Sequence, residues 1–268
     1  MKLIITGFSG FVAKSVFDNL DFARFEKVTI VSRFTIESFD FVEFLEYDEI
    51  LARTLDKYDC WLSIASDTID SIDNVTLSEF NCKLFHKLIL KLRLCVFRII
   101  HISSASLVHH ENVFESLYLQ SKLFQETLVR NSGIGYVVLR LSSPIGPGMN
   151  PNRIFPQMVR TIKQSLPFEF RGDIKRPQNY IDIRDVSRNI IEVLSDYDLN
   201  GVFYLSSPNS ISNLTLFEVL KFGLASSSNY VHSKSFAERG LDINANDHNI
   251  LYADHSYFSV LDTAALMK

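Results

Sequence analysis

The sequence predicts an α/β protein built on a doubly wound parallel sheet, with a smaller lobe toward its C-terminal end. Short apolar runs alternate with segments of helical periodicity, and the apolar runs are continuous. Strands that are buried on both faces show such continuous runs, and helices between them connect parallel strands. The composition, with 47% hydrophobic and 22% charged residues in a chain of 268, is typical of a globular protein that buries a full core.

Each expected strand is a short run rich in Val, Ile, Leu or aromatic residues, and each expected helix is a longer segment with apolar residues at helical spacing. The strands are Leu3–Thr6, Val28–Ser32, Phe41–Tyr47, Cys60–Ala65, Val96–Ser103, Tyr136–Leu141 and Val202–Leu205. The helices between them include Ala13–Leu20, Leu77–Leu92, Tyr118–Arg130 and Asp185–Leu194.

The composition changes after residue 143, because residues 144–177 hold most of the prolines and several glycines. We therefore expect a main domain at residues 1–143 that is completed by about 178–205. Residues 144–177 and 206–268 are expected to form the smaller lobe.

Several classes of protein are disfavoured by composition. No stretch reaches the roughly 18 apolar residues of a membrane span, and polar residues and glycines break the N-terminal apolar run, so the cytoplasm is the expected location. The net charge of -4 gives no general attraction to nucleic acid. The spacing of Cys60, Cys82 and Cys95 suggests neither a disulfide nor a zinc site, and the neighbouring residues His109 and His110 rarely converge on one ion, so no metal is expected.

The first strand is followed by a turn that is rich in glycine, at Thr6-Gly7-Phe8-Ser9-Gly10-Phe11-Val12-Ala13. In a dinucleotide-binding βαβ unit, glycines permit the tight turn and the close approach of backbone to pyrophosphate, which then meets the helix N-terminus. Gly7 and Gly10 suit the first two glycine positions, and Ala13 replaces the third. Taken alone, an ordinary turn explains this segment equally well.

The residues after the second strand bear on the choice of cofactor. NAD sites usually place Asp or Glu there to bind the ribose hydroxyls. This sequence has Val31-Ser32-Arg33 instead, and an arginine suits the additional 2′-phosphate of NADP. The alternative is a surface arginine with no such role.

Tyr118 and Lys122 form a Y-x-x-x-K pattern within a predicted helix. Positions four apart share a helix face, so the ammonium can lower the pKa of the phenol and make it a proton donor and acceptor. A chance match remains the alternative for a chain with ten tyrosines. Upstream, the strand that ends at Ser103 leads into Ser104 and Ser106, at the edge of the sheet where doubly wound folds bind ligands.

Together, these features resemble the short-chain dehydrogenase/reductase superfamily, and more closely its extended branch, the NAD(P)-dependent epimerase/dehydratase family that acts on nucleotide sugars. The T-G-x-x-G-x-x-G of this family is similar to Thr6–Ala13, and its S-S-x-x-V-Y-G to the segment from Ser103 to Val108. The resemblance covers residues 1 to about 225, and it implies a Rossmann fold with a substrate-binding lobe.

The family's later motifs occur in the expected order. Leu139–Gly148 resembles L-R-x-x-x-x-x-G-P-G, and Asn179–Val186 resembles R-D-[FY]-[IV]-x-V-x-D-V with Gln178 in place of the arginine. That arginine often helps to hold nucleotide phosphates, and Arg176 is a possible substitute two residues away. Gly201–Leu205 matches a late strand of the family.

The resemblance also implies residue roles. Asp48 falls where the family contacts adenine, and Ser63-Ile64-Ala65 corresponds to its H-L-A-A segment. The implied catalytic residues are Ser104, Tyr118 and Lys122, although a shift of one residue would place Ala105 at the serine position. The implied cofactor-binding residues are Gly7, Phe8, Ser9, Gly10, Phe11, Val12, Ser32, Arg33, Asp48, Ala65, Tyr118, Lys122, Leu141 and Pro144. The implied substrate-binding residues are Asn81, Ser106 and Arg176.

These implied roles favour an NADP(H)-dependent reductase of a keto group on a nucleotide-linked deoxysugar, with NAD as the second choice of cofactor. Tyr118 would protonate the alkoxide, Lys122 would hold the nicotinamide ribose, and Ser104 would bind the oxygen on which charge grows. The Asp-Glu pair of the dehydratases is replaced by Ala105 and Ser106. An epimerase that uses bound NAD(P) is the alternative, and a non-catalytic NADP-binding sensor or scaffold is a third. We also expect a homodimer, because Leu77–Leu92 and Tyr118–Arg130 match the two helices that family members commonly pair between subunits.

Overall fold

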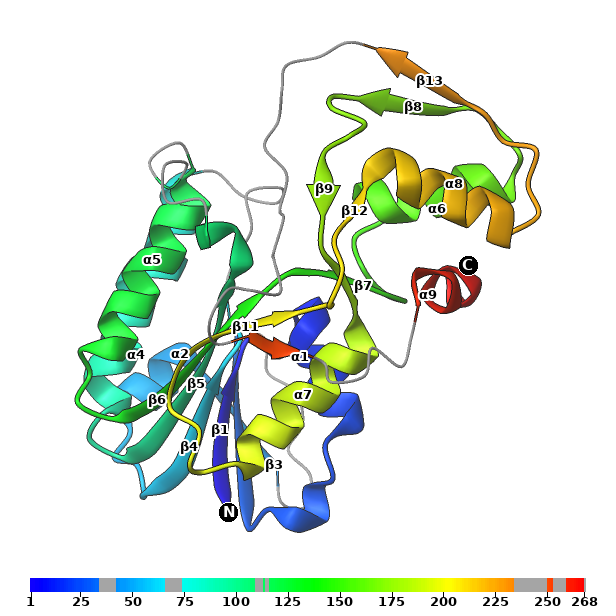
Figure 1. The fold of residues 1–268 in the computed structure, drawn as a ribbon. Helices are drawn as coiled ribbons and strands as arrows, with labels where there is room; N and C mark the ends of the chain where they lie inside the picture. Colours follow the sequence, from blue (N-terminus) through cyan, green and yellow to red (C-terminus); the bar gives the residue numbers. More distant parts are fainter. Residues whose placement is uncertain are drawn as a thin grey trace. The chain divides into compact units, whose positions relative to one another are not determined.

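The structure is a computed structural model that describes residues 1–33, 42–65, 74–108, 113, 116–233, 250–252 and 259–267. Phe41, His109 and His110 therefore lie outside the described residues. The chain divides into two compact units (Figure 1). Unit 1 comprises Met1–Leu141 and Ile190–Phe203, and unit 2 comprises Ser142–Asn189 and Tyr204–Lys268.

The core of unit 1 is one extended sheet. Its strands are β1 (Lys2–Thr6), β2 (Lys27–Ser32), β3 (Val42–Glu46), β4 (Tyr58–Ser63), β5 (Val96–Ser104), β6 (Gly135–Leu141) and β11 (Gly201–Ser206). They lie in the order β11-β6-β5-β4-β1-β2-β3. From β6 to β3, every neighbouring pair is parallel. The predicted doubly wound parallel sheet is therefore confirmed.

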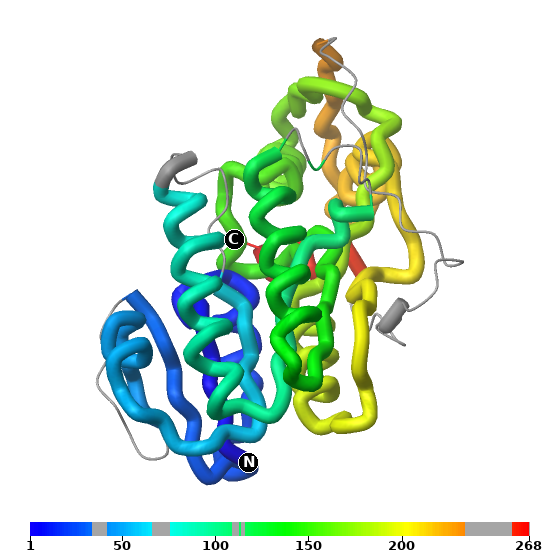
Figure 2. Tube along the Cα trace, turned by 90° about the vertical axis from the view of Figure 1, so that its left-hand side faces the viewer, coloured from blue at the N-terminus to red at the C-terminus, as the bar shows by residue number. Residues whose placement is uncertain are grey.

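Helices cover both faces of this sheet. They are α1 (Phe11–Asn19), α2 (Tyr47–Ala52), α3 (Asn74–Ser78), α4 (Phe85–Leu92), α5 (Leu117–Arg130) and the end of α7 (Ile183–Ser195), with short 3₁₀ turns η1 (Phe22–Arg24) and η3 (Ala105–Val108). Figure 1 shows α4 and α5 on one face and α1 on the other, and Figure 2 shows α4 and α5 side by side. Between this helix pair and the sheet lies an apolar core that includes Trp61, Phe85, Ile99 and Val129.

The predicted helix Leu77–Leu92 differs in detail from the observed one. A π-helical turn, η2 (Glu79–Leu84), separates α3 from α4. The extra residue of a π turn changes which side chains face the sheet, and it buries the polar side chain of Asn81 completely. Apolar periodicity alone does not reveal such an insertion.

In the residues that the structure describes, unit 2 combines short paired strands with three helices of its own and the first turns of α7. Its strands pair as β7 (Ser143–Ile145) with β10 (Tyr180–Asp182), β8 (Phe168–Arg171) with β13 (Tyr230–Ser233), and β9 (Pro177–Gln178) with β12 (Ile211–Ser212). The last three residues of β11 pair with β14 (Ile250–Tyr252). The helices are α6 (Ile154–Lys163), α8 (Asn213–Gly223) and α9 (Val260–Leu266).

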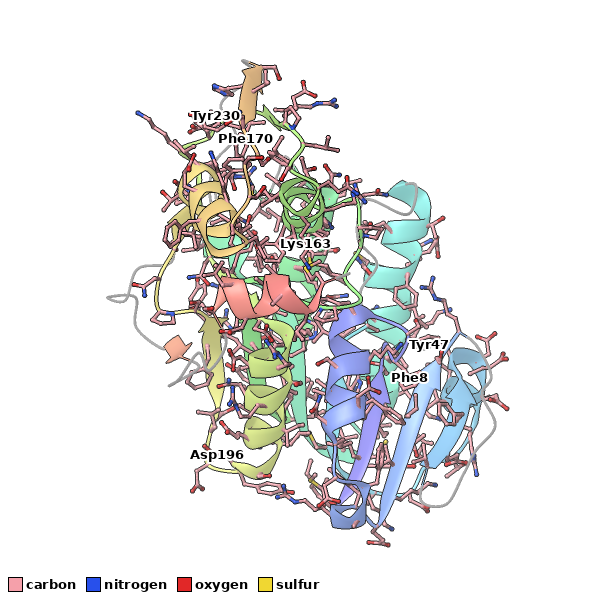
Figure 3. The ribbon with its side chains drawn as sticks, turned by 90° about the vertical axis from the view of Figure 1, so that its right-hand side faces the viewer. Phe8, Tyr47, Lys163, Phe170, Asp196 and Tyr230 are labelled. Carbon is pink, nitrogen blue, oxygen red and sulfur yellow. The ribbon has the colours of Figure 1, made fainter. Side chains whose placement is uncertain are left out.

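Aromatic rings form the centre of unit 2. Phe168, Phe170 and Phe217 are buried within a cluster that also takes in Phe155 and Leu220. Phe170 and Tyr230, which join β8 to β13, lie edge to face with centroids 5.7 Å apart (Figure 3). In the described part of the chain, each helix is too short or too polar to cross a membrane.

Candidate functional site

The glycine-rich turn after β1 is built around a backbone contact that a side chain would prevent. Gly7 has a φ of +94°, and a Cβ atom there would lie 2.4 Å from the backbone nitrogen of Ala65. The N–H of Gly10 donates to the carbonyl of Gly7 at 3.0 Å, and Gly10 then begins α1 with no side chain capping the helix. The turn thus brings Gly7 against Ala65 and leaves backbone N–H groups at the start of α1, where an anionic ligand is favoured.

The residues of this turn differ in their exposure to solvent. Ser9 and Gly10 are exposed, whereas Phe11 and Val12 are half-buried. The ring of Phe8 packs edge to face on Phe17 and Phe44, at 4.7 and 5.7 Å between centroids (Figure 3). Ala13, at the position of the third glycine, is 1% exposed in α1, so the small side chain is accommodated inside unit 1.

At the end of β2, Ser32 is buried and Arg33 is exposed. The guanidinium of Arg33 lies 4.8 Å from the ring centroid of Phe80, which in turn packs edge to face on Tyr47. Phe80 was not identified from the sequence, because it belongs to the π turn. Asp48 is exposed in the first turn of α2, one residue after Tyr47.

The Y-x-x-x-K pair lies at the start of α5, which Ser116 caps by accepting the N–H of Leu119 at 3.3 Å. Lys122 is 2% exposed, and its Nζ donates to the carbonyl of Ile102 at 2.9 Å. The same nitrogen is 5.9 Å from the ring centroid of Tyr118. Burial lowers the pKa of Lys122 to about 7, and the nearby carboxylate of Glu126 opposes that shift. The structure therefore brings Tyr118 and Lys122 together on one helix face.

Ser104 is the last residue of β5 and is 8% exposed. Its hydroxyl accepts the N–H of Ser106 at 3.3 Å, which joins the two serines in the turn η3. Leu107 in the same turn belongs to a small apolar cluster that includes Tyr118. The turn that follows Ser104 thus packs against the helix that carries Tyr118.

Asn81 contacts α5 between the positions of Tyr118 and Gln125. Its Nδ2 donates to Ser121 Oγ at 3.2 Å, and its carbonyl accepts from Gln125 Nε2 at 2.8 Å. Asn81 is 0% exposed, so in this structure it holds the π turn against α5. Its contact with a substrate stays a prediction.

The remaining predicted residues lie at the end of β6 and in unit 2. Leu141 ends β6 as the cross-strand partner of Ser104. Pro144 lies in β7, half-buried, and Arg176 lies just before β9, also half-buried. Gln178, which stands where the family has arginine, donates from Nε2 to Ser143 Oγ at 2.9 Å within unit 2.

Arg176 helps to line a cavity of about 330 Å³ within unit 2. Phe168 and Phe170 contribute aromatic walls, and Arg171 and Asn213 add polar groups. The backbone of Arg176 is fixed by two hydrogen bonds, to the carbonyl of Asp173 and from the N–H of Asn213, each 3.2 Å long. The sequence analysis did not predict this cavity, although the Phe168-Glu169-Phe170-Arg171 alternation could have indicated the half-buried strand that lines it.

Sequence reasoning missed two buried titratable residues beside Lys122. His101 on β5 is 0% exposed, and its Nδ1 is 3.2 Å from Ser63 Oγ. Burial, and secondarily the charge of Lys122, lowers the pKa of His101 well below its ordinary value. Glu126, the second residue, follows Lys122 by four positions, so continuing the helical spacing past the lysine would have found it. Within the described residues no cluster of three or more His, Cys, Asp or Glu could hold a metal ion.

Comparison with known proteins gives the fold and the family. No curated protein matches the chain. UDP-glucuronic acid 4-epimerase from Bacillus cereus, solved with NAD, matches with a TM-score of 0.75 at 19% identity, over 99% of this chain and 97% of that one. UDP-glucose 4-epimerase from Thermotoga maritima, solved with UDP-glucose, matches with a TM-score of 0.75 at 18% identity, over 100% and 97% of the two chains.

A dTDP-glucose 4,6-dehydratase from Streptomyces venezuelae, solved with NAD, also matches, with a TM-score of 0.71 at 18% identity over 90% of this chain and 88% of that one. At such identities these likenesses show the fold. The model of the NAD dependent epimerase/dehydratase family matches residues 3–205, which is more than half of the chain. The resemblance drawn from the sequence motifs is thereby confirmed, and the chain belongs to the NAD dependent epimerase/dehydratase family.

Proposed function

We propose that this protein is a nucleotide-sugar epimerase that inverts a carbon bearing a hydroxyl group, with a nicotinamide dinucleotide held in unit 1. The observation that carries the proposal is the buried Lys122, whose Nζ lies 5.9 Å from the ring of Tyr118 on the same face of α5. A pure binding protein has no need of a tyrosine and a desolvated amine in this arrangement. The solved relatives named as 4-epimerases support epimerisation over the net reduction expected from the sequence.

The residues of unit 1 fit a dinucleotide. The contact between Gly7 and Ala65 leaves no room for a side chain, and the uncapped start of α1 offers N–H groups to phosphate oxygens. When bound, the nicotinamide would accept a hydride from the sugar carbon and return it to the opposite face. NAD is the first candidate, because solved relatives hold NAD.

The chain's own residues would handle the proton. Tyr118 would take the proton of the sugar hydroxyl as the carbonyl forms, and would return it to the oxygen when the carbon is reduced again. Lys122, held by the carbonyl of Ile102, would place its ammonium beside the phenolate and the ribose. The hydroxyl of Ser104 would donate to the sugar oxygen while that oxygen carries negative charge.

Unit 2 would bind the nucleotide part of the substrate. The cavity of about 330 Å³ combines aromatic walls with Arg171 and Arg176. Such a site can neutralise a diphosphate with guanidinium groups. That Pro144 binds the cofactor stays a prediction from the family resemblance.

The test identifies the cofactor that the protein holds and the product that it forms. The purified protein is denatured and the released nucleotide identified, and the native protein is then incubated with UDP-glucose, UDP-glucuronic acid and UDP-N-acetylglucosamine without added cofactor. An epimerase would release bound NAD(P) and convert one sugar to its 4-epimer, reaching the same ratio from either side by NMR. Stoichiometric consumption of added NADPH by a keto sugar, without epimerisation, would replace this proposal with a reductase.

The reductase remains the second candidate because of one observation in this chain. Arg33 replaces the acid that usually binds the ribose of NAD, and Phe80 lies against its guanidinium. If NADP(H) is the cofactor, it should bind at least about tenfold more tightly than NAD(H), and Arg33→Ala should remove most of that margin of about 1.4 kcal/mol. Equal affinities of the parent protein for the two cofactors by calorimetry would remove this support for the reductase.

A further inference from the structure

A buried carboxylate lies one helical turn beyond Lys122 and has no part in the chemistry proposed above. Glu126 is 1% exposed, and its two oxygens accept three hydrogen bonds. Oε1 accepts from Ser103 Oγ at 2.6 Å and from Arg140 Nε at 3.0 Å, and Oε2 accepts from Arg140 Nη2 at 2.9 Å. The two bonds from Arg140 form the bidentate pair that fixes both the distance and the angle between a guanidinium and a carboxylate.

The two partners of Glu126 belong to the ends of neighbouring strands. Ser103 on β5 and Arg140 on β6 are cross-strand partners, and the next pair along the same strands is Ser104 and Leu141. Glu126 therefore attaches α5 to the sheet one residue before the positions where the catalytic serine is expected. Since Glu126, Lys122 and Tyr118 follow one another at intervals of four residues, this attachment also sets the height of Tyr118 above the strand ends.

The charge of Glu126 also acts on Lys122. Among the residues that the structure describes, the titratable or charged groups around Lys122 are Tyr118 and Glu126 on α5, His101 on β5, and Arg140 on β6, which is bonded to Glu126. The residue of η2 that bonds to α5 is Asn81, which carries no charge. Among these groups Glu126 brings the negative charge, and it favours the protonated amine that burial disfavours.

We propose that Glu126 is a positioning residue of the site, which fixes α5 on the ends of β5 and β6 and places its negative charge one helical turn from the amine of Lys122. The part of the proposal that concerns catalysis rests on the proposed function. The effect of Glu126 on the protonation of Lys122 does not depend on that function, because it can be measured in the protein without substrate.

The decisive measurement is the pKa of Lys122 from the pH dependence of its side-chain ¹³Cε signal, which Lys122→Arg identifies by its loss. Glu126→Gln keeps the shape of the side chain and removes its charge. We expect the pKa of Lys122 to fall by about one unit or more in Glu126→Gln, which is about a tenfold change in the protonation equilibrium. The matched control is Glu79→Gln, which breaks the exposed ion pair of Glu79 with Lys83, four residues away on the neighbouring helical segment. It should leave Lys122 unchanged.

A compensated variant covers the case in which Glu126→Gln does not fold, since it leaves the guanidinium of Arg140 without its carboxylate. Glu126→Gln/Arg140→Met removes both charges of the pair, and the pKa of Lys122 should then fall less than in the single variant but still below that of the parent. An unchanged pKa of Lys122 in whichever of the two variants gives a parent-like circular dichroism spectrum overturns the proposal.

Activity supplies the second readout. With any substrate that the parent converts, Glu126→Gln should move the alkaline limb of the kcat/KM profile to lower pH by the same shift as the NMR titration, and Glu79→Gln should not. If no sugar nucleotide is converted by the parent, the proposed function fails while the NMR result still decides the effect of Glu126 on Lys122. A shifted NMR titration with an unmoved kcat/KM profile would overturn the catalytic part of the proposal.

Discussion

At the scale of single residues, the hydroxyl of Tyr118 is the group on which the proposed chemistry depends. Tyr118→Phe keeps the ring that packs with Leu107 but removes the proton donor and acceptor. General acid–base catalysis contributes about 10² to 10⁴ in rate, so turnover should fall by that order while cofactor affinity barely changes. Initial rates and a cofactor titration check this, and activity within a factor of about two of the parent would mean that the pattern is a chance match.

Two serine variants test which hydroxyl at the end of β5 takes part in the reaction. Ser104→Ala should slow turnover with little effect on the cofactor. Its hydroxyl also accepts the N–H of Ser106, so a matched variant is needed. If Ser106→Ala causes the larger loss of turnover, the alignment that makes Ser104 the catalytic serine is wrong.

His101 predicts a dependence of stability on pH. Its folded-state pKa is depressed by burial, so below about pH 6.5 the unfolded chain binds a proton that the folded chain does not. Stability from this group is therefore fully present above that pH and is lost progressively as the pH falls toward the folded pKa, by up to about 1.4 kcal/mol per unit.

His101→Phe should remove this dependence, since a phenyl ring can retain the packing on Phe85, whose ring centroid is 5.2 Å away. Urea unfolding at pH 8 and pH 5 measures how the free energy of unfolding depends on pH. His86→Gln, at an exposed histidine, is the control. The variant loses the bond to Ser63, which costs about 1 kcal/mol at both pH values. A parent and variant with the same slope against pH would contradict the prediction.

At the scale of elements, the close approach of Gly7 to Ala65 in the turn between β1 and α1 can be tested with Gly148 as a control. Gly7 and Gly148 have similar backbone angles, with φ of +94° and +89°, but a Cβ on Gly148 meets nothing within 4 Å. Alanine at either position costs about 1–3 kcal/mol in backbone strain. Gly7→Ala should cost more, because the backbone of Ala65 has to move, and cofactor affinity should fall at least about tenfold.

Titration of the two variants with cofactor compares their affinities, and chemical denaturation measures how much stability each alanine costs. Gly148→Ala should keep the cofactor affinity of the parent. Equal losses of affinity in both variants would show that the close approach of Gly7 to Ala65 is unimportant for binding.

The strands and the glycine turn could be predicted from the sequence because their signals are local. The run Val96–Ser103 is buried along nearly its whole length, as the observed β5 shows, and its continuous apolar character is what a doubly covered strand requires. The three paired sheets of unit 2 gave no such signal, because β9 and β12 have only two residues each and are held by pairing between distant segments.

The parts of the candidate site whose residues lie on one helix or in one turn could be predicted from the sequence. Tyr118 and Lys122 share a helix, and the spacing of four residues suffices to place them together. Phe80 and His101 required the tertiary structure, because Arg33 and Lys122 belong to other elements. The helical spacing could have revealed Glu126 beside Lys122, but not its bonds to Ser103 and Arg140 on two strands. Asn81 was expected at a substrate, and its burial follows from the π turn that apolar periodicity does not encode.

At the scale of the whole molecule, we predict a homodimer through α4 and α5. These helices lie side by side (Figure 2) and expose apolar side chains, with Leu90 46% and Phe124 40% exposed. Leu90→Glu/Phe124→Glu should raise the dimer dissociation constant by about 100-fold or more, because each chain would bury two charges without partners. Light scattering at micromolar concentration measures the mass.

The control for this prediction is Phe222→Glu on α8, a residue that is 89% exposed and belongs to unit 2. It should leave the mass unchanged. A parent protein with the mass of one chain would contradict the prediction, and so would a Phe222→Glu variant that dissociates as the double variant does.

The chain passes between the two units after Leu141, Asn189 and Phe203. Because synthesis proceeds from the N-terminus, β5 leaves the ribosome long before the segment that completes its unit. Arg98 of β5 is 6% exposed and donates to the carbonyls of Val193 and Leu199, at 3.1 and 2.9 Å. Until those residues are made, burying this guanidinium would leave it without these acceptors, so the side chain of Arg98 has to stay hydrated. Chain synthesis must therefore pass Leu199 before Arg98 can be buried with both of its acceptors in place.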